Sequence, residues 1–421
     1  LSGRLLLRYR GYYHFTTAKP FHKEMIMTQL RPGVHWVGVR EWAKKFFHGH
    51  ELSIAHGTSY NSYLIVDEKI ALIDSVKNEH AEEFLQNVSR IVPLSKIDYF
   101  IVNHGEPDHS GAFTRLLAAN PRAKVVASKN GAQILKRHYP GAYDVQVMKT
   151  GDQLSLGKKT LKFFDTQMLH WPDSIFAYCP EEKILFPNDA FGQHYASSSL
   201  YADECDQCEV WQEAIKYYAN ILTPYSARII VKVGEFVGLG WPVEMICPSH
   251  GLIWRKDPLT IVNKYVEWAS GKAQAAVVVI YDTIWHGTEK MARSICRGLE
   301  TEGVPFRLFN AGTSDFNDVM TEILKARGVL VGGPTLNNNL MPTLVPYLES
   351  IRGLRFVNKI GAAFGTYGWS GEGVGRIEEF LVSGGVKIVQ VGYRVSYAPG
   401  EEDLKQCEVF GQQFARQVKE S

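Results

Sequence analysis

Histidines and carboxylates that could bind metal ions are concentrated in one short stretch, Asn103-His-Gly-Glu-Pro-Asp-His-Ser-Gly111. Its four candidate ligands, His104, Glu106, Asp108 and His109, cannot all point one way from a single strand or helix. A tight turn would let them surround a small volume. Each of these residue types is a common ligand of transition metals. We therefore predict a metal site in this turn.

Three further candidate ligands follow at longer spacing, each beside Pro or Gly after a short apolar segment. They are His170 in Met168-Leu-His-Trp-Pro-Asp-Ser, Asp189 in Phe186-Pro-Asn-Asp-Ala-Phe-Gly, and His250 in Cys247-Pro-Ser-His-Gly251. A single histidine in such a place is usually structural. The ordered set, in contrast, predicts one clustered site at the ends of several strands.

The order of these residues resembles the metallo-β-lactamase superfamily, whose two-metal site uses an H-x-H-x-D-H motif followed by His, Asp and His. All of these positions are occupied between residues 104 and 250, but Glu106 stands where the hydrolases carry a second histidine. A carboxylate there adds a hard, anionic oxygen ligand, which favours iron or manganese over zinc. This replacement is the mark of the flavodiiron proteins.

The resemblance implies which iron each candidate ligand binds. One iron is bound by His104, Glu106 and His170, and the other by Asp108, His109 and His250, with Asp189 between them. Tyr195 follows Asp189 closely and is a candidate hydrogen-bond donor to a metal-bound ligand. A packed structural tyrosine is the alternative.

A second set of motifs predicts a flavin site. Tyr281-Asp-Thr-Ile-Trp-His-Gly-Thr-Glu289 follows an apolar strand and opens a helix, where backbone N–H groups and small hydroxyls bind phosphate. It resembles the flavodoxin phosphate loop, (S/T)-x-T-x-x-T, with Trp285 and His286 departing from Thr and Gly. Two later loops lie where a flavodoxin holds its isoalloxazine ring. The candidate FMN-binding residues are Thr283, Trp285, His286, Gly287, Thr288, Pro334, Thr335, Asn337, Asn338, Asn339, Gly365, Thr366, Tyr367, Gly368, Trp369, Ser370 and Gly371.

Two differently built halves must position these motifs. Before Gly271, strands are followed by helices, which is typical of a sandwich with helices on its outer faces. After it, strands and helices alternate strictly, as in a doubly wound parallel sheet. We predict an α/β protein: an αββα metallo-β-lactamase-like diiron domain at residues 27–270, and a flavodoxin-like, five-stranded FMN domain at residues 274–421.

The predicted elements can be stated by range. The first half has a hairpin of strands 62–66 and 70–74, strands 98–102 and 124–128, and helices 111–119, 207–222 and 226–237. The second half has strands 275–281, 306–309, 328–331, 359–364 and 386–391, alternating with helices 288–302, 314–326, 342–350, 373–383 and 401–419.

Composition narrows the function further. A chain of 421 residues suits two domains, and 46 basic residues against 44 acidic ones give no sign of nucleic-acid binding. The longest apolar runs are too short to cross a membrane. Among six cysteines only Cys205 and Cys208 form a close pair, which we interpret as reduced thiols of a cytoplasmic protein, with a redox or metal role as the alternative. Residues 1–26, basic at first and free of acids until Glu24, resemble a transit peptide or translated upstream sequence and are left out of the fold.

The resemblance to flavodiiron proteins implies a function. The family reduces O2 to water or NO to N2O at the diiron site, with electrons passing through FMN. Because a rubredoxin module needs two Cys-x-x-Cys knuckles and the chain has one, we expect a separate donor, such as rubredoxin or another reductase. The family brings the flavin of one subunit over the iron site of another in a head-to-tail dimer, so we expect a homodimer or a tetramer.

Two alternatives stay open at this point. One is a zinc-dependent hydrolase of the β-lactamase or glyoxalase type, against which Glu106 argues. The other is an electron-transfer flavoprotein with a vestigial metal site, against which the complete set of ligand types argues.

Overall fold

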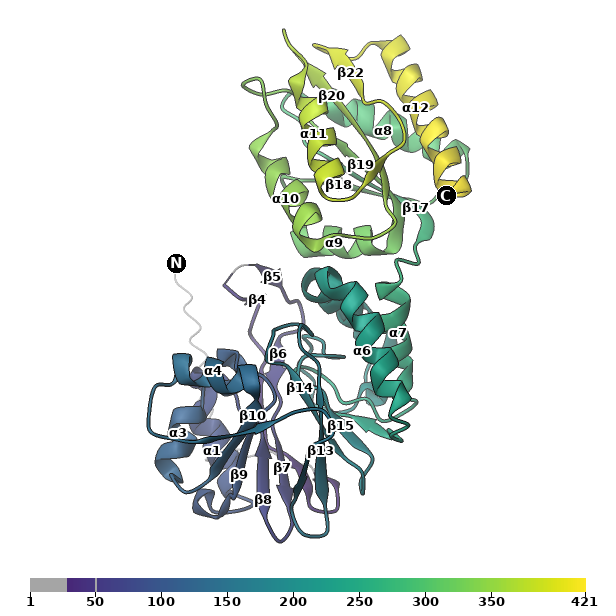
Figure 1. Cartoon of the computed structure of the whole chain (residues 1–421). Coiled ribbons are helices and arrows are strands. Elements are labelled where there is room, and N and C mark those ends of the chain that lie inside the picture. The colour runs from purple at the N-terminus through teal and green to yellow at the C-terminus, as the bar shows by residue number, and fades with distance from the viewer. Residues whose placement is uncertain (1–28, 50) are drawn as a thin grey trace, which may run out of the picture.

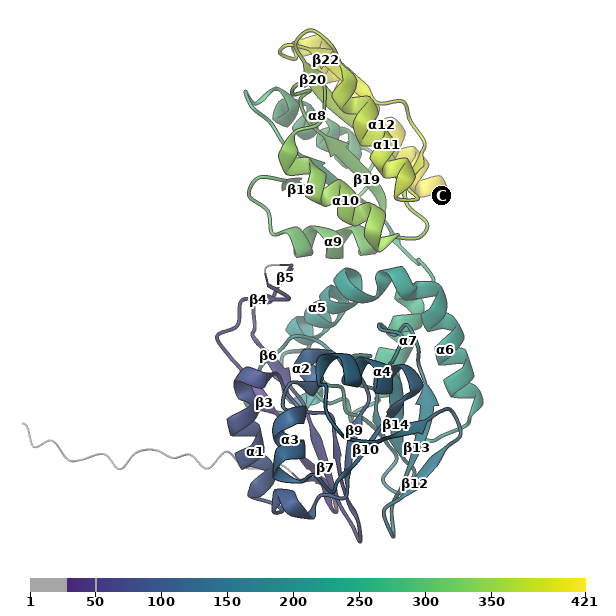
Figure 2. The same cartoon turned by 60° about the vertical axis from the view of Figure 1, so that its left-hand side comes forward.

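The computed structural model describes residues 29–49 and 51–421, which form two lobes stacked end to end (Figure 1). The N-terminal lobe contains two packed sheets, and the C-terminal lobe contains one sheet with helices on both faces (Figure 2). The leader predicted at residues 1–26 lies outside the described residues.

The first sheet of the N-terminal lobe has the strand order β1-β2-β7-β8-β9-β10-β11. Its predicted hairpin is present, with Tyr63 opposite Ile73 across β7 and β8. Strands β8, β9, β10 and β11 then run parallel, so their carboxyl ends meet at one edge. The strands are β1 (Gln29–Arg31), β2 (Val34–Trp36), β7 (Tyr63–Val66), β8 (Ile70–Ile73), β9 (Tyr99–Val102), β10 (Lys124–Ser128) and β11 (Val145–Met148).

The second sheet has the order β12-β13-β14-β15-β16. An apolar core that includes Ile65 and Ile101 of the first sheet and Leu161, Phe163 and Ala177 of the second joins the two sheets. The strands are β12 (Gln153–Ser155), β13 (Thr160–Asp165), β14 (Ile175–Cys179), β15 (Ile184–Phe186) and β16 (Met245–Ile246). Two small pairs lie apart, β3 (Val39–Glu41) with β6 (Thr58–Tyr60) and β4 (Phe46–Phe47) with β5 (Leu52–Ser53).

Helices cover the outer faces of this sandwich, as predicted. The predicted helix 207–222 is α-helical only as far as Tyr217 and continues as a π-helical turn, η4 (Tyr218–Leu222). Four of the helices described below, α1, α2, α4 and α7, were not predicted from the sequence. The helices are α1 (Ala81–Ser89), α2 (Pro107–Ser110), α3 (Phe113–Ala119), α4 (Lys129–His138), α5 (Gln207–Tyr217), α6 (Ser226–Gly238) and α7 (Leu259–Ala269).

The C-terminal lobe is a parallel sheet in the order β18-β17-β19-β20-β21, which is the flavodoxin-like order. The predicted fifth strand, 386–391, is wrong in extent: its place beside β20 is shared by two short strands, β21 and β22, because the chain leaves the sheet between them. The strands are β17 (Gln274–Tyr281), β18 (Phe306–Asn310), β19 (Ala326–Gly332), β20 (Ile360–Tyr367), β21 (Lys387–Ile388) and β22 (Tyr393–Ser396).

The predicted helices of this lobe are all present, with small shifts at their ends. They are α8 (Gly287–Thr301), α9 (Phe316–Lys325), α10 (Val345–Leu354), α11 (Glu372–Ser383) and α12 (Glu401–Glu420). Helix α9 packs against α5 and η4 of the N-terminal lobe. One apolar cluster therefore runs through both lobes and includes Tyr218 and Leu222 on one side and Met320 and Ile323 on the other.

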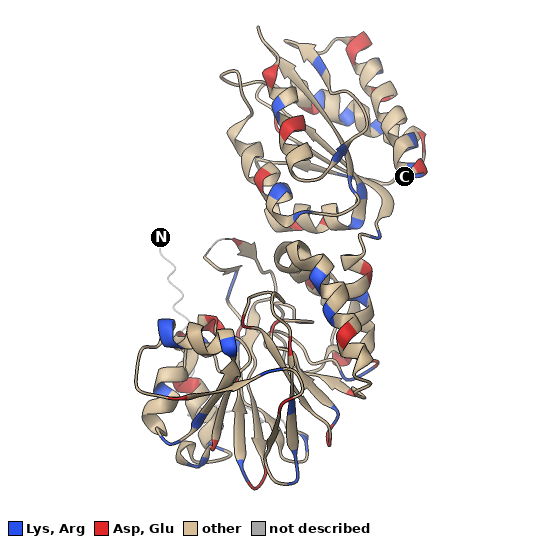
Figure 3. Ribbon diagram, viewed as in Figure 1, with Lys and Arg blue, Asp and Glu red and all other residues tan. Residues whose placement is uncertain are grey.

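The surface charge is mixed. Lys and Arg alternate with Asp and Glu over both lobes in the view of Figure 3. Within the described part of the chain, none of the helices is long and apolar enough to span a membrane.

A lysine of the C-terminal lobe is buried and hydrogen-bonded to the backbone. Lys359, 3% exposed, donates hydrogen bonds from Nζ to the carbonyl oxygens of Leu324 (2.8 Å) and Ala326 (2.6 Å), where α9 turns into β19. Burial lowers the pKa of Lys359 from its ordinary 10.5 to about 7. In the pH range between these two values, the unfolded chain binds more protons than the folded chain, so stability should rise with pH.

Replacing this lysine provides the first test. From pH 7 to pH 9, we expect the free energy of unfolding of the wild-type protein to rise relative to that of Lys359→Met, by at most about 1.4 kcal/mol per pH unit. Urea denaturation of both proteins across this range measures the difference. Parallel pH profiles would show that Lys359 stays charged inside the fold.

Candidate metal and flavin sites

The candidate ligands are brought together by strand ends and one short helix. Strand β9 ends directly before the turn that contains His104, and Glu106 precedes α2 in an extended conformation. Helix α2 then presents Asp108 and His109. Asp189 follows β15, and His250 follows β16 at the neighbouring position of the second sheet.

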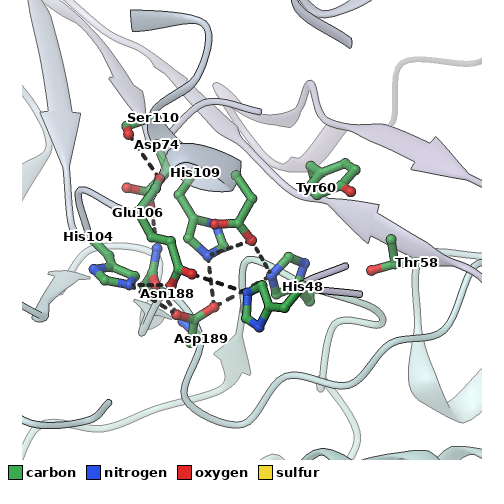
Figure 4. A network of polar contacts seen from close by, with 12 residues as sticks. His48, Thr58, Tyr60, Asp74, His104, Glu106, His109, Ser110, Asn188 and Asp189 are labelled. Atoms are coloured by element: carbon green, nitrogen blue, oxygen red, sulfur yellow. Dashed lines mark hydrogen bonds and ion pairs between the residues drawn. The ribbon is translucent and has the colours of Figure 1, made fainter. Parts of the chain in front are cut away.

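The ligand atoms fall into two groups. His104, Glu106, His170 and Asp189 form one group, and Asp108, His109 and His250 form the other, with the ligand atoms of each group within 4.8 Å of one another. Figure 4 shows several of these side chains converging from their separate elements. All of the predicted metal ligands therefore meet at one place.

Asp189 stands between the two groups. Its Oδ2 lies 3.3 Å from His170 Nε2 and 3.6 Å from His104 Nε2, whereas its Oδ1 lies 2.9 Å from His109 Nε2 and 3.6 Å from His250 Nε2. One carboxylate thus presents a different oxygen to each group. This is the arrangement that a carboxylate bridging two cations requires.

Outer partners orient two of the histidines. Because a carboxylate only accepts, His104 donates its Nδ1–H to Asp173 Oδ1 at 3.0 Å and turns Nε2 inward. His250 likewise donates Nδ1–H to the Ser59 carbonyl at 2.7 Å. Asp173 also accepts the Gly105 backbone N–H at 2.7 Å. Such partners fix both tautomer and ring direction in metal sites. Asp173 was quoted in the His170 motif, but sequence reasoning did not assign it a role.

Unpartnered buried atoms point to what the site holds. Asp108 Oδ1 is buried without a hydrogen-bond partner, and His109 Nε2 and Asp189 Oδ2 are buried with only other candidate metal ligands close by. Orphaned donors and acceptors of this kind are rare in a folded interior. Three carboxylates and four imidazoles arranged in two groups fit a pair of divalent cations, and their mixed oxygen and nitrogen donors suit iron.

The histidines and carboxylates in the site shift one another's pKa values. Burial acts to lower the pKa of His104, but Asp173 and Glu106 together raise it well above its ordinary value. Burial acts to raise the pKa of Asp189, but His109 and the other imidazoles hold it well below its ordinary value. The carboxylates are therefore ionised and ready to bind a cation.

Three aromatic residues near the site were missed by sequence reasoning. His48, on the loop after β4, donates Nε2–H to Glu106 Oε1 at 3.1 Å (Figure 4). The His194 ring lies 4.9 Å from that of His250, and the Tyr217 ring lies 6.4 Å from it. No motif marks these residues, because each comes from a separate element. Tyr195 instead donates to Glu209 Oε2 at 2.6 Å, which favours the structural alternative for that residue.

The predicted flavin residues lie at the carboxyl ends of β17, β19 and β20, which are neighbours in the sheet. Thr288 and Thr366 share a hydrogen bond of 3.1 Å between their hydroxyls, and Thr335 donates its backbone N–H to Thr366 O at 2.8 Å. Residues 365–367 are the last residues of β20 itself, not of a loop. The three segments are thus linked before any ligand binds.

Two observations fit a flavin phosphate and ring at this edge. No side chain caps the N-terminus of α8, so its first N–H groups are free for an anion. The hydroxyls of Thr283 and Ser370 are buried without a hydrogen-bond partner. Trp285 and Trp369 are 89% and 84% exposed and offer flat apolar faces beside these loops.

Some flavin-loop residues have a conformational role. Asn337 and Asn338 both have positive φ, at 51° and 58°, and form the tip of a tight turn closed by Leu336 and Asn339. Asparagine tolerates this region better than most residues. His286 is bonded to Glu289 Oε2 at 2.9 Å. A fourth segment at this edge, 397–400 after β22, was missed because the fifth strand was predicted to end too early.

The close cysteine pair lies away from both sites, at the start of α5. Cys205 is partly buried, with Sγ 3.2 Å from Ser197 Oγ, and Cys208 is exposed. Both are free thiols.

Comparison with known proteins identifies the family. Residues 58–251 match the ODP family beta lactamase, and residues 279–411 match flavodoxin. The chain is 44% identical to a nitric oxide reductase of Moorella thermoacetica, over 92% of this chain and 98% of that protein. It superimposes on the flavodiiron protein of Giardia intestinalis with a TM-score of 0.88 and 35% identity, covering 93% of this chain and 97% of that one. The chain belongs to the flavodiiron family.

A second solved structure agrees. The rubredoxin oxygen:oxidoreductase of Desulfovibrio gigas matches with a TM-score of 0.91 and 39% identity, over 93% of this chain and 98% of that chain. The predicted two-domain fold is thereby confirmed. This flavodiiron chain is an oxidoreductase that uses FMN and a non-haem diiron centre.

The role of Asp173 can be tested directly. In Asp173→Ala, His104 loses the acceptor that orients it, and we expect iron affinity to fall about 10- to 100-fold. Competition with a chelator measures this. Asp165→Ala is a matched control in the same lobe, because the Asp165 carboxylate accepts the Thr150 backbone N–H, at 3.2 Å, and no other hydrogen bond from the described residues. Equal iron loss in both variants would contradict a specific role for Asp173.

Proposed function

We propose that this flavodiiron chain reduces O2 to water, NO to N2O, or both, with electrons delivered through FMN from a separate donor such as rubredoxin. The observation that carries the proposal is the position of Asp189, with one oxygen toward each ligand group. Two adjacent cations can hold a diatomic molecule between them. The names of the relatives, nitric oxide reductase and rubredoxin oxygen:oxidoreductase, support the same reaction class.

The proposed ligands keep the assignment made from the family resemblance. His104, Glu106 and His170 would hold one iron, Asp108, His109 and His250 would hold the other, and Asp189 lies where it could contact both. When bound, the irons and FMN would supply the electrons, four for O2 and two for a pair of NO molecules. The carboxylates offset the cationic charge, and Asp173 and Ser59 hold two imidazoles in place.

The chain also shapes the space beside the irons. Phe47 lies 5.3 Å from His250 and 4.3 Å from His194, ring centre to ring centre, and is 4% exposed. The Tyr217 ring contacts His194 as well, 5.1 Å from it, so aromatic rings gather beside the proposed metal ligands. A small uncharged gas is favoured in such surroundings over a hydrated substrate.

The proposed FMN site uses the loops after β17, β19 and β20. The N-terminus of α8, with the hydroxyls of Thr283 and Thr288, binds the phosphate. Residues 334–339 and 365–371 hold the ring system, with Trp369 against one face. Residues 27–270 and 274–421 are proposed as the two functional domains, each with its own cofactor.

The metal and flavin content of the purified protein and its consumption of each gas test the proposed function. Purified protein should contain about two iron atoms and one FMN per chain, because the donors fit a mixed oxygen and nitrogen site. Anaerobic assays with each gas and a reduced rubredoxin should show consumption of NO, O2 or both. Zinc-loaded wild-type protein with no gas consumption would contradict the proposal.

Replacing Glu106 tests its role in metal choice. Glu106→His should shift metal preference from iron toward zinc and lower turnover, whereas the exposed Glu420→His serves as control.

We propose further that flavin and irons meet across two copies of the chain. Strand β22, which pairs with the carboxyl-terminal half of β20, lies at the end of its lobe remote from the N-terminal lobe in both Figure 1 and Figure 2. The flavin loops are at this end, far from the chain's own metal groups. The exposed Trp285 and Trp369 leave an apolar surface there for a second copy to cover.

Complementation of two inactive variants tests this arrangement. One parent is Asp189→Ala, and the other is Thr283→Ala with Trp369→Ala, which removes an unpartnered hydroxyl and an exposed ring and so spares the fold. A heterodimer contains one intact flavin facing one intact metal site, so it should recover up to about half of wild-type turnover. FMN content of each parent is measured first. Complete absence of recovery would place electron transfer within one chain.

A further inference from the structure

The β4–β5 hairpin extends from the N-terminal lobe to the base of the C-terminal lobe. In both Figure 1 and Figure 2, β5 lies next to α9. The loop after β4 carries His48, whose φ of 48° is in the left-handed region, followed by Gly49 at 73°. This sharp turn directs His48 Nε2 at Glu106 Oε1, 3.1 Å away. One hairpin therefore touches both a proposed iron ligand and the flavodoxin-like lobe.

Asn317 of α9 holds this hairpin by its backbone. Its Oδ1 accepts the Ser53 N–H at 2.8 Å, and its Nδ2 donates to the Glu51 carbonyl at 3.0 Å. The side-chain amide thus pairs with the hairpin as a neighbouring strand would. Asp315 adds a bond from the Ser53 hydroxyl at 2.8 Å. Asn317 is 5% exposed, and its two bonds to the hairpin are partly buried, so removing its amide would leave two hairpin backbone groups without these partners.

The same amide also reaches the helix on the other side of the site. Asn317 Nδ2 donates to Asn220 Oδ1 at 2.9 Å, and Asn220 Nδ2 donates back to the Asn317 carbonyl at 3.2 Å. Asn220 lies in η4, the π-helical turn that begins directly after Tyr217. Turns of this kind are frequent at functional sites. One residue of the flavodoxin-like lobe therefore contacts both the hairpin that carries His48 and the π-helical turn that follows Tyr217.

The two oxygens of Glu106 have different surroundings. Oε2 lies among the metal ligands, 3.1 Å from His104 Nε2 and 3.6 Å from His170 Nε2. Oε1 points away and is held by His48 (Figure 4). A carboxylate bound in this way offers one oxygen to a cation and keeps the second occupied.

We propose that Asn317 is a positioning residue for the diiron centre of its own chain. By holding the β4–β5 hairpin, it keeps His48 on Glu106 Oε1, so that Glu106 would offer only Oε2 to a bound iron. This inference rests on the proposed function, because it takes Glu106 as an iron ligand. It assigns the flavodoxin-like lobe a second role, separate from binding flavin.

The experiment compares Asn317→Ala with Asn310→Ala in the full chain. Asn310 is the control, because its side chain accepts the Gly312 N–H at 2.8 Å within the C-terminal lobe and touches nothing in the N-terminal lobe among the bonds described. In metal-free protein, amide exchange of the described residues of 46–54 should quicken about fivefold or more in Asn317→Ala, since the loss of even one of the two hydrogen bonds accounts for such a change, and stay unchanged in the control. Unchanged exchange in both would overturn the proposal.

The iron-loaded protein supplies the second readout. Asn317→Ala should raise KM for the gas about fivefold or more with a smaller change in kcat, and should alter the electron paramagnetic resonance spectrum of the half-reduced centre as His48→Ala does. The double variant Asn317→Ala/His48→Ala should have the same KM and the same spectrum as each single variant, because both substitutions act through the contact between His48 and Glu106. Additive effects, or an unaltered spectrum, would overturn the proposal.

Two further measurements keep the outcomes distinct. If Asn317→Ala fails to fold, Ser53→Ala removes one hairpin bond from the opposite side and should shift exchange and KM in the same direction. A wild-type protein that binds no iron would overturn the proposed function, and with it the role of Glu106. Even then, the exchange of residues 46–54 would decide whether Asn317 holds the hairpin.

Discussion

Three ionised carboxylates share a small buried volume with four imidazoles, and most of the architecture serves to keep them there. Asp189 is 2% exposed, and its two oxygens face different ligand groups. Buried charges of one sign repel one another unless cations or charged partners offset them. The strand ends supply the positions, whereas Asp173 and Ser59 supply the orientation. The sandwich therefore holds a cluster of carboxylates whose negative charge is offset by the neighbouring imidazoles and would be offset further by bound metal ions.

The candidate metal ligands could be picked out from the sequence because each lies beside a strand end that a local pattern reveals. His104, His170 and His250 follow apolar segments, and the structure brings them together. Alternation of strands and helices likewise predicted the flavodoxin-like lobe. The contacts that sequence patterns did not predict are those between segments far apart in the chain. His48 on Glu106 and Asn317 on Ser53 depend on how separate elements pack, and no local pattern encodes that.

Local patterns also misled where the backbone departs from regularity. The apolar run 386–391 resembles one strand, but the chain leaves the sheet after Ile388 and returns at Tyr393. In this strand, tertiary contacts outweighed local propensity. The predicted helical stretch 207–222 is helical throughout, although local patterns did not reveal that its last part is a π-helical turn. The positive φ values of Asn337 and Asn338 likewise add a conformational role that the sequence pattern did not reveal.

The end-to-end stacking of the lobes has a consequence for dilution if flavin and irons meet across two copies, as proposed (Figure 1). Under that proposal a lone chain would lack a complete electron path. Turnover per chain would then be governed by mass action, since only associated copies would contain the full path. Specific activity would fall steeply once the concentration drops below the dissociation constant of the pair. The cell could therefore set the capacity for gas reduction through the amount of protein alone, with a response steeper than proportional.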